Sequence, residues 1–357
     1  MASHCHLSQE QQGELKVMGS ESKGKMKDVI RMVIFLGIGF FFIWWFLLKL
    51  DPEQKAAIWD SFREANYWWV ALAMVCCLLS HLVRALRWKL LFKPLELSPT
   101  LNHTFGSVVI AYMGNLAFPR AGEVMRCATL RTSEGIPIEK SLGTVVTERI
   151  IDLLAFALIV LIGMVVMLGK AKDWLYDTLS EKFTALPNMA MIITAAVVMV
   201  VLAFMFYKLL WKKLLHIKFF AKIDELVHGM VGGVKSVFHM GRRNTILFLL
   251  YSAVIYLLYI LGGLIIFHAF GETSWLGLRA AFVVYLFGTV GMTFSQGGIG
   301  VYPALVMMGL TDIYGISMEV GTACGWMLWG SQQAAVIAVG AAYMVYFSIK
   351  KRLTVNV

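Results

Sequence analysis

The sequence predicts an all-α polytopic membrane protein with about six full transmembrane helices and two broken re-entrant hairpins. Hydrophobic residues make up 59% of the 357 residues and charged residues only 15%, whereas soluble domains average about 45–50% and 25%. Long apolar runs recur along the chain, and the 32 Lys and Arg residues, against 22 Asp and Glu, cluster between them. This pattern excludes a soluble enzyme, a disordered chain and a nucleic-acid-binding domain, in which basic residues would cover one face of a water-soluble fold.

Six apolar segments are long enough to cross the hydrocarbon core, which takes about 20 helical residues. They lie at residues 29–48, 67–88, 144–168, 188–208, 245–269 and 318–348. The last segment exceeds one crossing, so part of it should tilt or extend into the cytoplasm. We expect the mostly polar residues 1–28 to form a disordered N-terminal tail.

Two further apolar segments each run into a break rich in Gly or Pro, after which a short helical stretch follows. The segments are 101–118 and 276–294, the breaks are 114–123 and 295–300, and the stretches lie near 122–133 and 301–313. Non-helical backbone at membrane depth is tolerated only where it packs in protein or lines a cavity. The sequence therefore predicts two re-entrant hairpins, and two ordinary tight turns between spans are the alternative.

The charges of the loops predict the orientation of the chain. Lys and Arg dominate residues 84–93, 208–243 and 350–352, whereas residues 49–64 and 170–187 carry mixed charges. The positive-inside rule places the basic set, and with it both termini, in the cytoplasm. Residues 209–243 form a basic amphipathic segment that lies along the inner leaflet or connects the spans through solvent.

With this orientation the chain divides into two transmembrane repeats, 29–168 and 188–348. Each contains a span, a connecting segment, a span, a broken hairpin and a span. The first hairpin must begin and end in the cytoplasm and the second outside, so the second half runs in the opposite direction. An inverted-topology repeat with matching breaks is typical of transporters that bind their substrate near the middle of the membrane.

Ionisable residues gather at the first break and at the start of the span that follows it. They are Arg120, Glu123, Arg126, Glu148, Arg149 and Asp152. Glu123 and Arg126 share a helix face, as do Glu148 and Asp152, because side chains three or four residues apart are neighbours. Charges inside spans usually face a bundle interior or an aqueous cavity, and arginine suits phosphate geometry. The group predicts a site for an anionic lipid head group, and internal ion pairing is the alternative.

This group holds three arginines and three acids, so phosphate binding would need some acids to be protonated or turned away. Asn115 and the backbone of Gly297, Gly298 and Gly300 should shape the same cavity, with Gln296 as a neutral hydrogen-bonding group.

Other polar residues on the apolar segments have simpler interpretations. We interpret Arg84, Arg87 and Lys89 as side chains that extend to the cytoplasmic interface. Tyr251, Tyr256 and Tyr259 are assigned to packing or to an interfacial belt.

At its charged residues and its two breaks the chain resembles the transmembrane region of lysylphosphatidylglycerol synthases, also called the flippase-like domain. The motifs are Arg84-x-x-Arg87-Trp88, Gly114-Asn115-x-x-x-Pro119-Arg120-x-Gly122-Glu123-x-x-Arg126, Glu148-Arg149-x-x-Asp152 and Gly297-Gly298-Ile299-Gly300. The resemblance covers nearly all of residues 30–350. It implies an integral membrane protein of bacteria or archaea that is associated with moving or modifying lipids. The second break departs from the family, in which Pro precedes the glycines and Arg-Glu follows them, so the substrate and direction are not carried over.

The leading hypothesis is a lipid translocator in a prokaryotic inner membrane, which moves an anionic phospholipid or a lipid-linked phosphate between leaflets. A non-transporting membrane partner of a separate lipid synthase is the alternative, and a lipid-modifying enzyme is a further one. No nucleophile–base pair, metal motif or nucleotide loop is recognisable in the sequence. We therefore expect no catalytic residues, no cofactor, no metal and no nucleic-acid partner.

Overall fold

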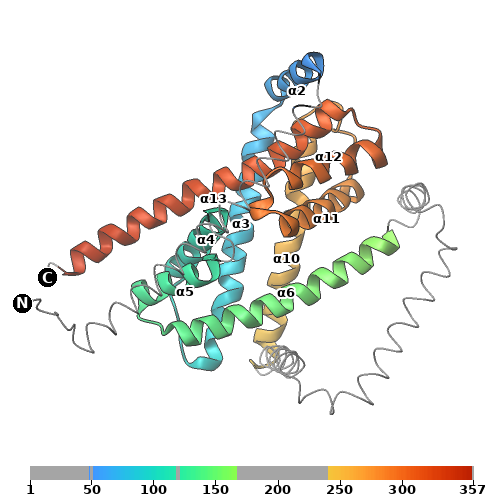
Figure 1. Ribbon diagram of the computed structural model, residues 1–357. Helices are drawn as coiled ribbons and strands as arrows, with labels where there is room; N and C mark the ends of the chain where they lie inside the picture. The colour runs from blue at the N-terminus through green and yellow to red at the C-terminus, as the bar shows by residue number, and fades with distance from the viewer. Residues whose placement is uncertain (1–47, 49–50, 118–120, 167–239, 356–357) are drawn as a thin grey trace, which may run out of the picture.

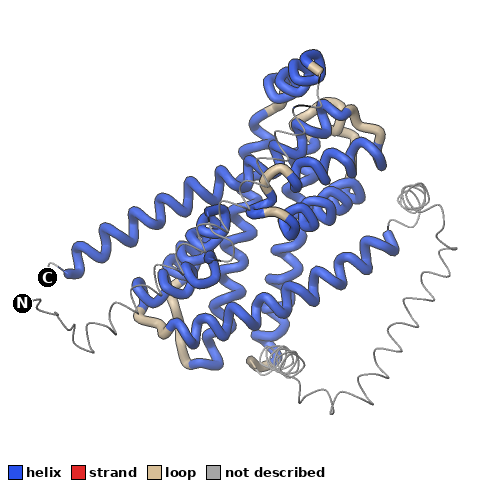
Figure 2. Tube along the Cα trace, viewed as in Figure 1, coloured by secondary structure: helices blue, strands red, loops and turns tan. Residues whose placement is uncertain are grey.

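A computed structural model describes residues 48, 51–117, 121–166 and 240–355, and these residues form helices joined by short turns, with no β-strand among them (Figures 1 and 2). Nearly all of the predicted spans 29–48 and 188–208, and most of the basic segment 209–243, lie outside the described residues.

The helices match the predicted segments closely, except for α2, which lies in residues 49–64 where a loop was expected. They are α2 (Pro52–Glu64), α3 (Tyr67–Phe92), α4 (Leu101–Ala117), α5 (Ala121–Glu134), α6 (Ile138–Val166), α10 (Arg242–Phe267), α11 (Leu278–Phe294), α12 (Val301–Tyr314) and α13 (Met318–Val355), with 3-10 turns η1 (Lys93–Leu95) and η2 (Gln296–Gly298).

Three segments are long and apolar enough to cross a membrane, at Tyr67–Leu95, Arg242–Phe267 and Met318–Lys350, and α11 and α12 are shorter apolar helices. α13 has 38 residues, or about 57 Å at 1.5 Å per residue. The predicted excess over a single crossing is confirmed.

Both predicted breaks separate two helices that pack against each other as a hairpin, α4 with α5 and α11 with α12. In the first, a Glu134 carboxylate oxygen accepts hydrogen bonds from the Thr100 backbone N–H (3.0 Å) and hydroxyl (2.6 Å). In the second, the Glu272 carboxylate accepts from the backbone N–H of Ser317 and from its hydroxyl (2.7 Å). These contacts hold the two ends of each hairpin together. The prediction of two helix–break–helix units is confirmed, and their depth in a membrane stays a prediction.

The first hairpin needs a glycine at its break because the two helices approach closely there. A Cβ added to Gly122 would lie 2.2 Å from the Ala111 carbonyl oxygen, which is far inside van der Waals contact. The Gly122 N–H donates to the Asn115 side-chain oxygen at 2.8 Å. Asn115 therefore ties the end of α4 to the start of α5 across the break.

The second hairpin turns through three glycines in left-handed conformations, Gly297 (φ 59°), Gly298 (φ 78°) and Gly300 (φ 74°). Residues with a Cβ rarely adopt such angles. The Trp329 indole N–H donates to the Gly297 carbonyl at 2.7 Å and fixes the turn to α13. A Cβ on Gly297 would lie 2.8 Å from a Leu116 methyl group, so the breaks of the two hairpins touch each other.

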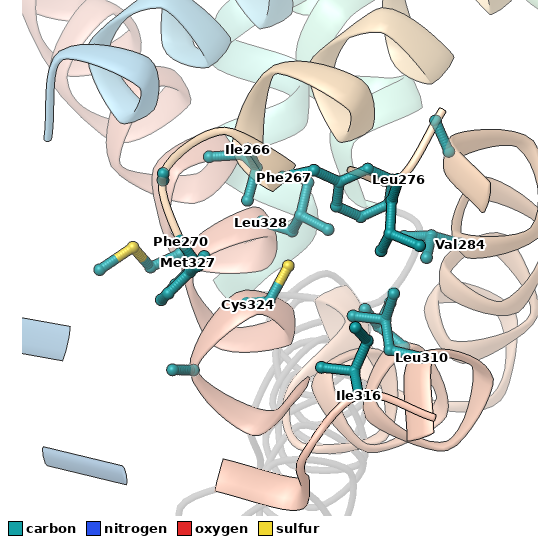
Figure 3. Close-up of a cluster of buried hydrophobic side chains, with 14 of the residues drawn as sticks. Ile266, Phe267, Phe270, Leu276, Val284, Leu310, Ile316, Cys324, Met327 and Leu328 are labelled. Atoms are coloured by element: carbon teal, nitrogen blue, oxygen red, sulfur yellow. The ribbon is translucent and has the colours of Figure 1, made fainter. Parts of the chain in front are cut away.

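Two large hydrophobic cores surround these hairpins. One core joins α11 and α12 to the first half of α13 and the end of α10, and Figure 3 shows its side chains, among them Phe267, Leu310 and Cys324. The other lies among α3, α4, α5, α6 and α10 and contains Trp88 and Phe248.

One end of the molecule, where α3, α5 and α13 finish and α4, α6 and α10 begin, carries more basic than acidic residues (lower left of Figure 1). We call it the basic end. Its basic residues are Lys89, Lys93, Arg131, Lys140, Arg242, Arg243 and Lys350, and its acids are Glu96, Glu134 and Glu139. This is the end that the charge pattern predicts to face the cytoplasm.

Candidate functional site

Five charged side chains from three helices meet inside the second core, and we call them the charged cluster. They are Arg84 and Arg87 on α3, Arg126 on α5, and Glu148 and Asp152 on α6. The three arginines and Glu148 are at most 4% exposed. Charges at such burial persist only when they are paired, because removing an ion from water costs several kcal/mol.

Glu148 lies at the centre of the charged cluster. One of its carboxylate oxygens accepts from Arg84 Nη1 (3.0 Å) and Arg87 Nη2 (2.9 Å), and the other lies 3.0 Å from Arg126 Nη1. Asp152, one turn further along α6, lies 2.8 Å from Arg84 Nη1 and 2.7 Å from Arg87 Nη1. The spacing of the two acids on one face of α6 therefore gives each α3 arginine two carboxylate partners.

The interpretation of Arg84 and Arg87 as interfacial side chains is wrong. Arg84 is 4% exposed and Arg87 is fully buried. Both lie more than a helical turn before the end of α3 at Phe92, and their chains reach sideways to α6 instead of along α3 to the interface. The two acids on α6 supply the charge that makes this burial stable. Lys89, which follows them, stays partly exposed.

α10 adds three polar groups to the charged cluster. Ser252 was not expected from the sequence, and Tyr256 and Tyr259, which the sequence assigns to packing or an interfacial belt, contact the cluster instead. The Ser252 hydroxyl accepts from Arg87 Nη1 at 2.9 Å, and the Tyr259 hydroxyl lies 3.4 Å from Arg84 Nη2. The Tyr256 hydroxyl donates to the Asp152 backbone carbonyl at 3.2 Å. Their spacing of four and three residues places them on one face of an otherwise apolar helix, and this is the signal that could have identified them.

Arg126 has two buried donors without a hydrogen-bond partner among the described residues, whereas Arg84 and Arg87 each have one, the Nε. The Arg126 guanidinium carbon lies 3.6 Å from the centre of the Trp88 ring, and the Trp88 indole N–H is itself held by the Thr144 hydroxyl at 2.8 Å. The two donors of Arg126 without a partner are its Nε and Nη2 atoms. A buried donor without a partner is costly, and a ligand that brings an acceptor would offset this cost.

A second ion pair lies at the more exposed edge of the charged cluster, where Arg149 Nη2 is 3.1 Å from a Glu123 carboxylate oxygen. Glu123 therefore pairs with Arg149 on α6 and not with Arg126 on its own helix. With this pair included, the described residues supply four arginines against three acids. The described residues of the site therefore carry one net positive charge, whereas the neutral count from the sequence left out the two α3 arginines and included Arg120, which lies outside the described residues.

The remaining predicted site residues have other positions. Arg120 lies outside the described residues. Asn115 closes the first break, while Gly297, Gly298 and Gly300 form the second, with Gln296 starting the turn η2. Within the described part of the chain, no three His, Cys, Asp or Glu side chains gather as metal ligands.

Comparisons with known proteins agree with a membrane protein of lipid or glycan-carrier metabolism. The chain is 28% identical to the glycosyltransferase AglD of Haloferax volcanii over 111 residues, which is 31% of this chain and 17% of that protein. The matched region is thus less than a fifth of the relative's own length. No solved structure matches the chain. The family model of the lysylphosphatidylglycerol synthase TM region matches residues 30–346, so this protein belongs to that family.

Proposed function

We propose that the protein is a lipid translocator, which moves an anionic phospholipid or a lipid-linked phosphate between the two leaflets. The observation that carries the proposal is the buried guanidinium of Arg126, with two N–H donors lacking a partner beside a cluster of net positive charge. Arginine presents these donors in a planar fork that matches a phosphate group. Membership of a family named for a lipid synthase supports a lipid as the source of that phosphate.

The rest of the charged cluster positions Arg126 and limits its motion. Glu148 binds one edge of the guanidinium while Trp88 covers its face. The unpartnered Nε and Nη2 then remain as the free edge for a phosphate oxygen. Arg84 and Arg87 neutralise both α6 acids, so the acids do not repel the head group.

Translocation needs a polar path, because an ion in bare hydrocarbon costs many kcal/mol. In this proposal the two hairpins enter the membrane from opposite sides as parts of an inverted repeat, with the basic end in the cytoplasm. Their breaks touch at Leu116 and Gly297, which supports a path that runs between them. The lipid tails stay in the bilayer while the head group passes.

The test is transfer of fluorescent phosphatidylglycerol, or of a lipid-linked phosphate, between leaflets of vesicles that contain the reconstituted protein. Arg126→Gln should abolish transfer above the rate of empty vesicles, and Arg126→Lys should keep only part of it, because ammonium lacks the planar fork. Arg131→Gln is the matched control, since Arg131 lies on the same helix and is exposed. Wild-type transfer equal to that of empty vesicles for every anionic lipid would overturn the proposal.

A non-transporting partner of a lipid-modifying enzyme is the second candidate, and the partial similarity to a protein named as a glycosyltransferase favours it. In this case the charged cluster would hold a lipid phosphate for an enzyme to modify. Binding of the anionic lipid would then depend on Arg126 while transfer would be absent. Measuring binding and transfer on the same variants separates the two functions.

A further inference from the structure

A cavity of about 510 Å³ lies at the basic end, and its lining includes no residue of the charged cluster. α4 supplies one wall with Ile110, α5 another with Met125 and Ala128, and α13 the third with Met344 and Phe347. These side chains are apolar, and the volume falls within the range of about 300–1,000 Å³ of ligand sites. The cavity is therefore suited to an apolar group.

Polar groups also line the cavity towards the ends of α5 and α13. Thr129, Thr132 and Ser133 on α5 and Lys350 on α13 are among the lining residues. The Lys350 ammonium lies 3.0 Å from His103 Nε2, and His103 Nδ1 lies 2.6 Å from the Glu134 carboxylate that closes the first hairpin. These contacts hold the lysine charge at the cavity, where the lining changes from apolar to polar.

We propose that this cavity binds one anionic phospholipid of the leaflet at the basic end, with an acyl chain among the apolar side chains and the phosphate beside Lys350. The lining matches such a lipid in both parts, with hydroxyls and an ammonium next to apolar side chains. The surrounding surface is basic, and basic residues at a membrane surface attract anionic lipids. This goes beyond the proposed function, because the lipid binds here whether or not it is transferred.

The size of the cavity favours an acyl chain over a protein segment. A helix with its side chains is about 10–12 Å across, so a volume of about 510 Å³ accommodates only about one helical turn. An acyl chain is thinner and flexible, and it enters such a space without displacing α5 or α13.

The test uses the full protein in phosphatidylcholine vesicles that contain a phosphatidylglycerol probe with a photoreactive diazirine in one acyl chain. Peptide mapping should place the label on α5 and α13 residues that line the cavity. Met344→Trp should fill the cavity and reduce this labelling several-fold. Val345→Trp, at the adjacent and similarly exposed position outside the lining, should leave it unchanged.

Two further measurements identify the head-group contact and the independence of the site. Lys350→Gln should lower the preference for phosphatidylglycerol over a matched phosphatidylcholine probe about fivefold, as expected for ~1 kcal/mol per basic residue near an anionic surface. Arg126→Gln should keep cavity labelling while transfer is lost. Equal labelling of Met344→Trp and Val345→Trp, or equal labelling by both wild-type probes, would refute the site. A cross-link between the cavity and residues 29–48 would show that this segment occupies the cavity, and this result would also refute the lipid site.

Discussion

The α4–α5 hairpin contributes to a cluster of buried charges, whereas the α11–α12 hairpin packs in an apolar core. Arg126 on α5 shares Glu148 with the α3 arginines, while Leu310 and Val306 on α12 are buried among aliphatic and aromatic groups. The bases of both hairpins are nonetheless held in the same way, by a carboxylate that accepts from a backbone N–H and a hydroxyl. The two hairpins are therefore held together in the same way at their bases but bury different residues. Charged side chains gather beside α4–α5, and the turn of left-handed glycines belongs to α11–α12.

The largest expected effect comes from removing the centre of the charged cluster. Glu148→Ala leaves three buried arginines with Asp152 alone, and we expect it to lower the free energy of unfolding by about 3–5 kcal/mol, the usual cost of breaking a buried ion pair. Unfolding in mixed micelles measures this, with the exposed Glu139→Ala as the control.

Leu310→Ala tests the apolar core around the second hairpin. It should also destabilise, by about 2–5 kcal/mol through the cavity it creates, but the folded fraction should retain its transfer rate. A loss of transfer per folded molecule in Leu310→Ala would show that the two interiors are not functionally distinct.

A smaller effect is expected at the contact between the two breaks. Gly297→Ala and Gly315→Ala both place a Cβ on a left-handed residue, at a cost of about 1–2 kcal/mol. Only Gly297 faces a close neighbour, Leu116, while nothing lies within 4 Å of a Cβ at Gly315. We therefore expect Gly297→Ala to be the more destabilising variant in thermal unfolding, and Leu116→Ala to remove most of the difference. Equal melting temperatures for the two glycine variants would mean that the contact contributes little.

The smallest effect is a pH dependence at the base of the first hairpin. Burial alone would raise the pKa of Glu134, but hydrogen bonds from Thr100 and His103 outweigh burial and hold it below its ordinary value of 4.5. The resulting stabilisation, under about 1 kcal/mol for a partly exposed group, is complete above pH 4.5 and is lost as the pH falls through the lower folded-state pKa. Glu134→Gln should flatten this part of the stability–pH curve relative to wild type, and an unchanged curve would contradict the role of Glu134.

The helices and breaks were predictable because they depend on local patterns. The apolar runs 101–118 and 276–294, each followed by a break rich in Gly or Pro, predicted α4 and α11, and the short stretches beyond them became α5 and α12. The acids Glu148 and Asp152 could likewise be placed on one helix face from their spacing alone.

The partners of those acids could not be predicted in the same way. Arg84 and Arg87 lie more than 60 residues from Glu148 in the sequence, and only the packing of α3 against α6 and α10 brings them together. The composition of α3 is equally compatible with arginines that reach the interface. The polar spacing of Ser252, Tyr256 and Tyr259 was the available signal for a buried polar site on α10.

The continuity of α13 links the two hairpins mechanically. Its first half packs against α12 so closely that a Cβ on Gly325 would lie 2.6 Å from the Pro303 carbonyl, and its second half packs on α4 at Gly340 and against Gly106. α13 is one continuous helix from Met318 to Val355 and packs against both α12 and α4. If it tilts as a unit about its middle, its two ends move in opposite directions, so an opening beside one hairpin would accompany a closing beside the other.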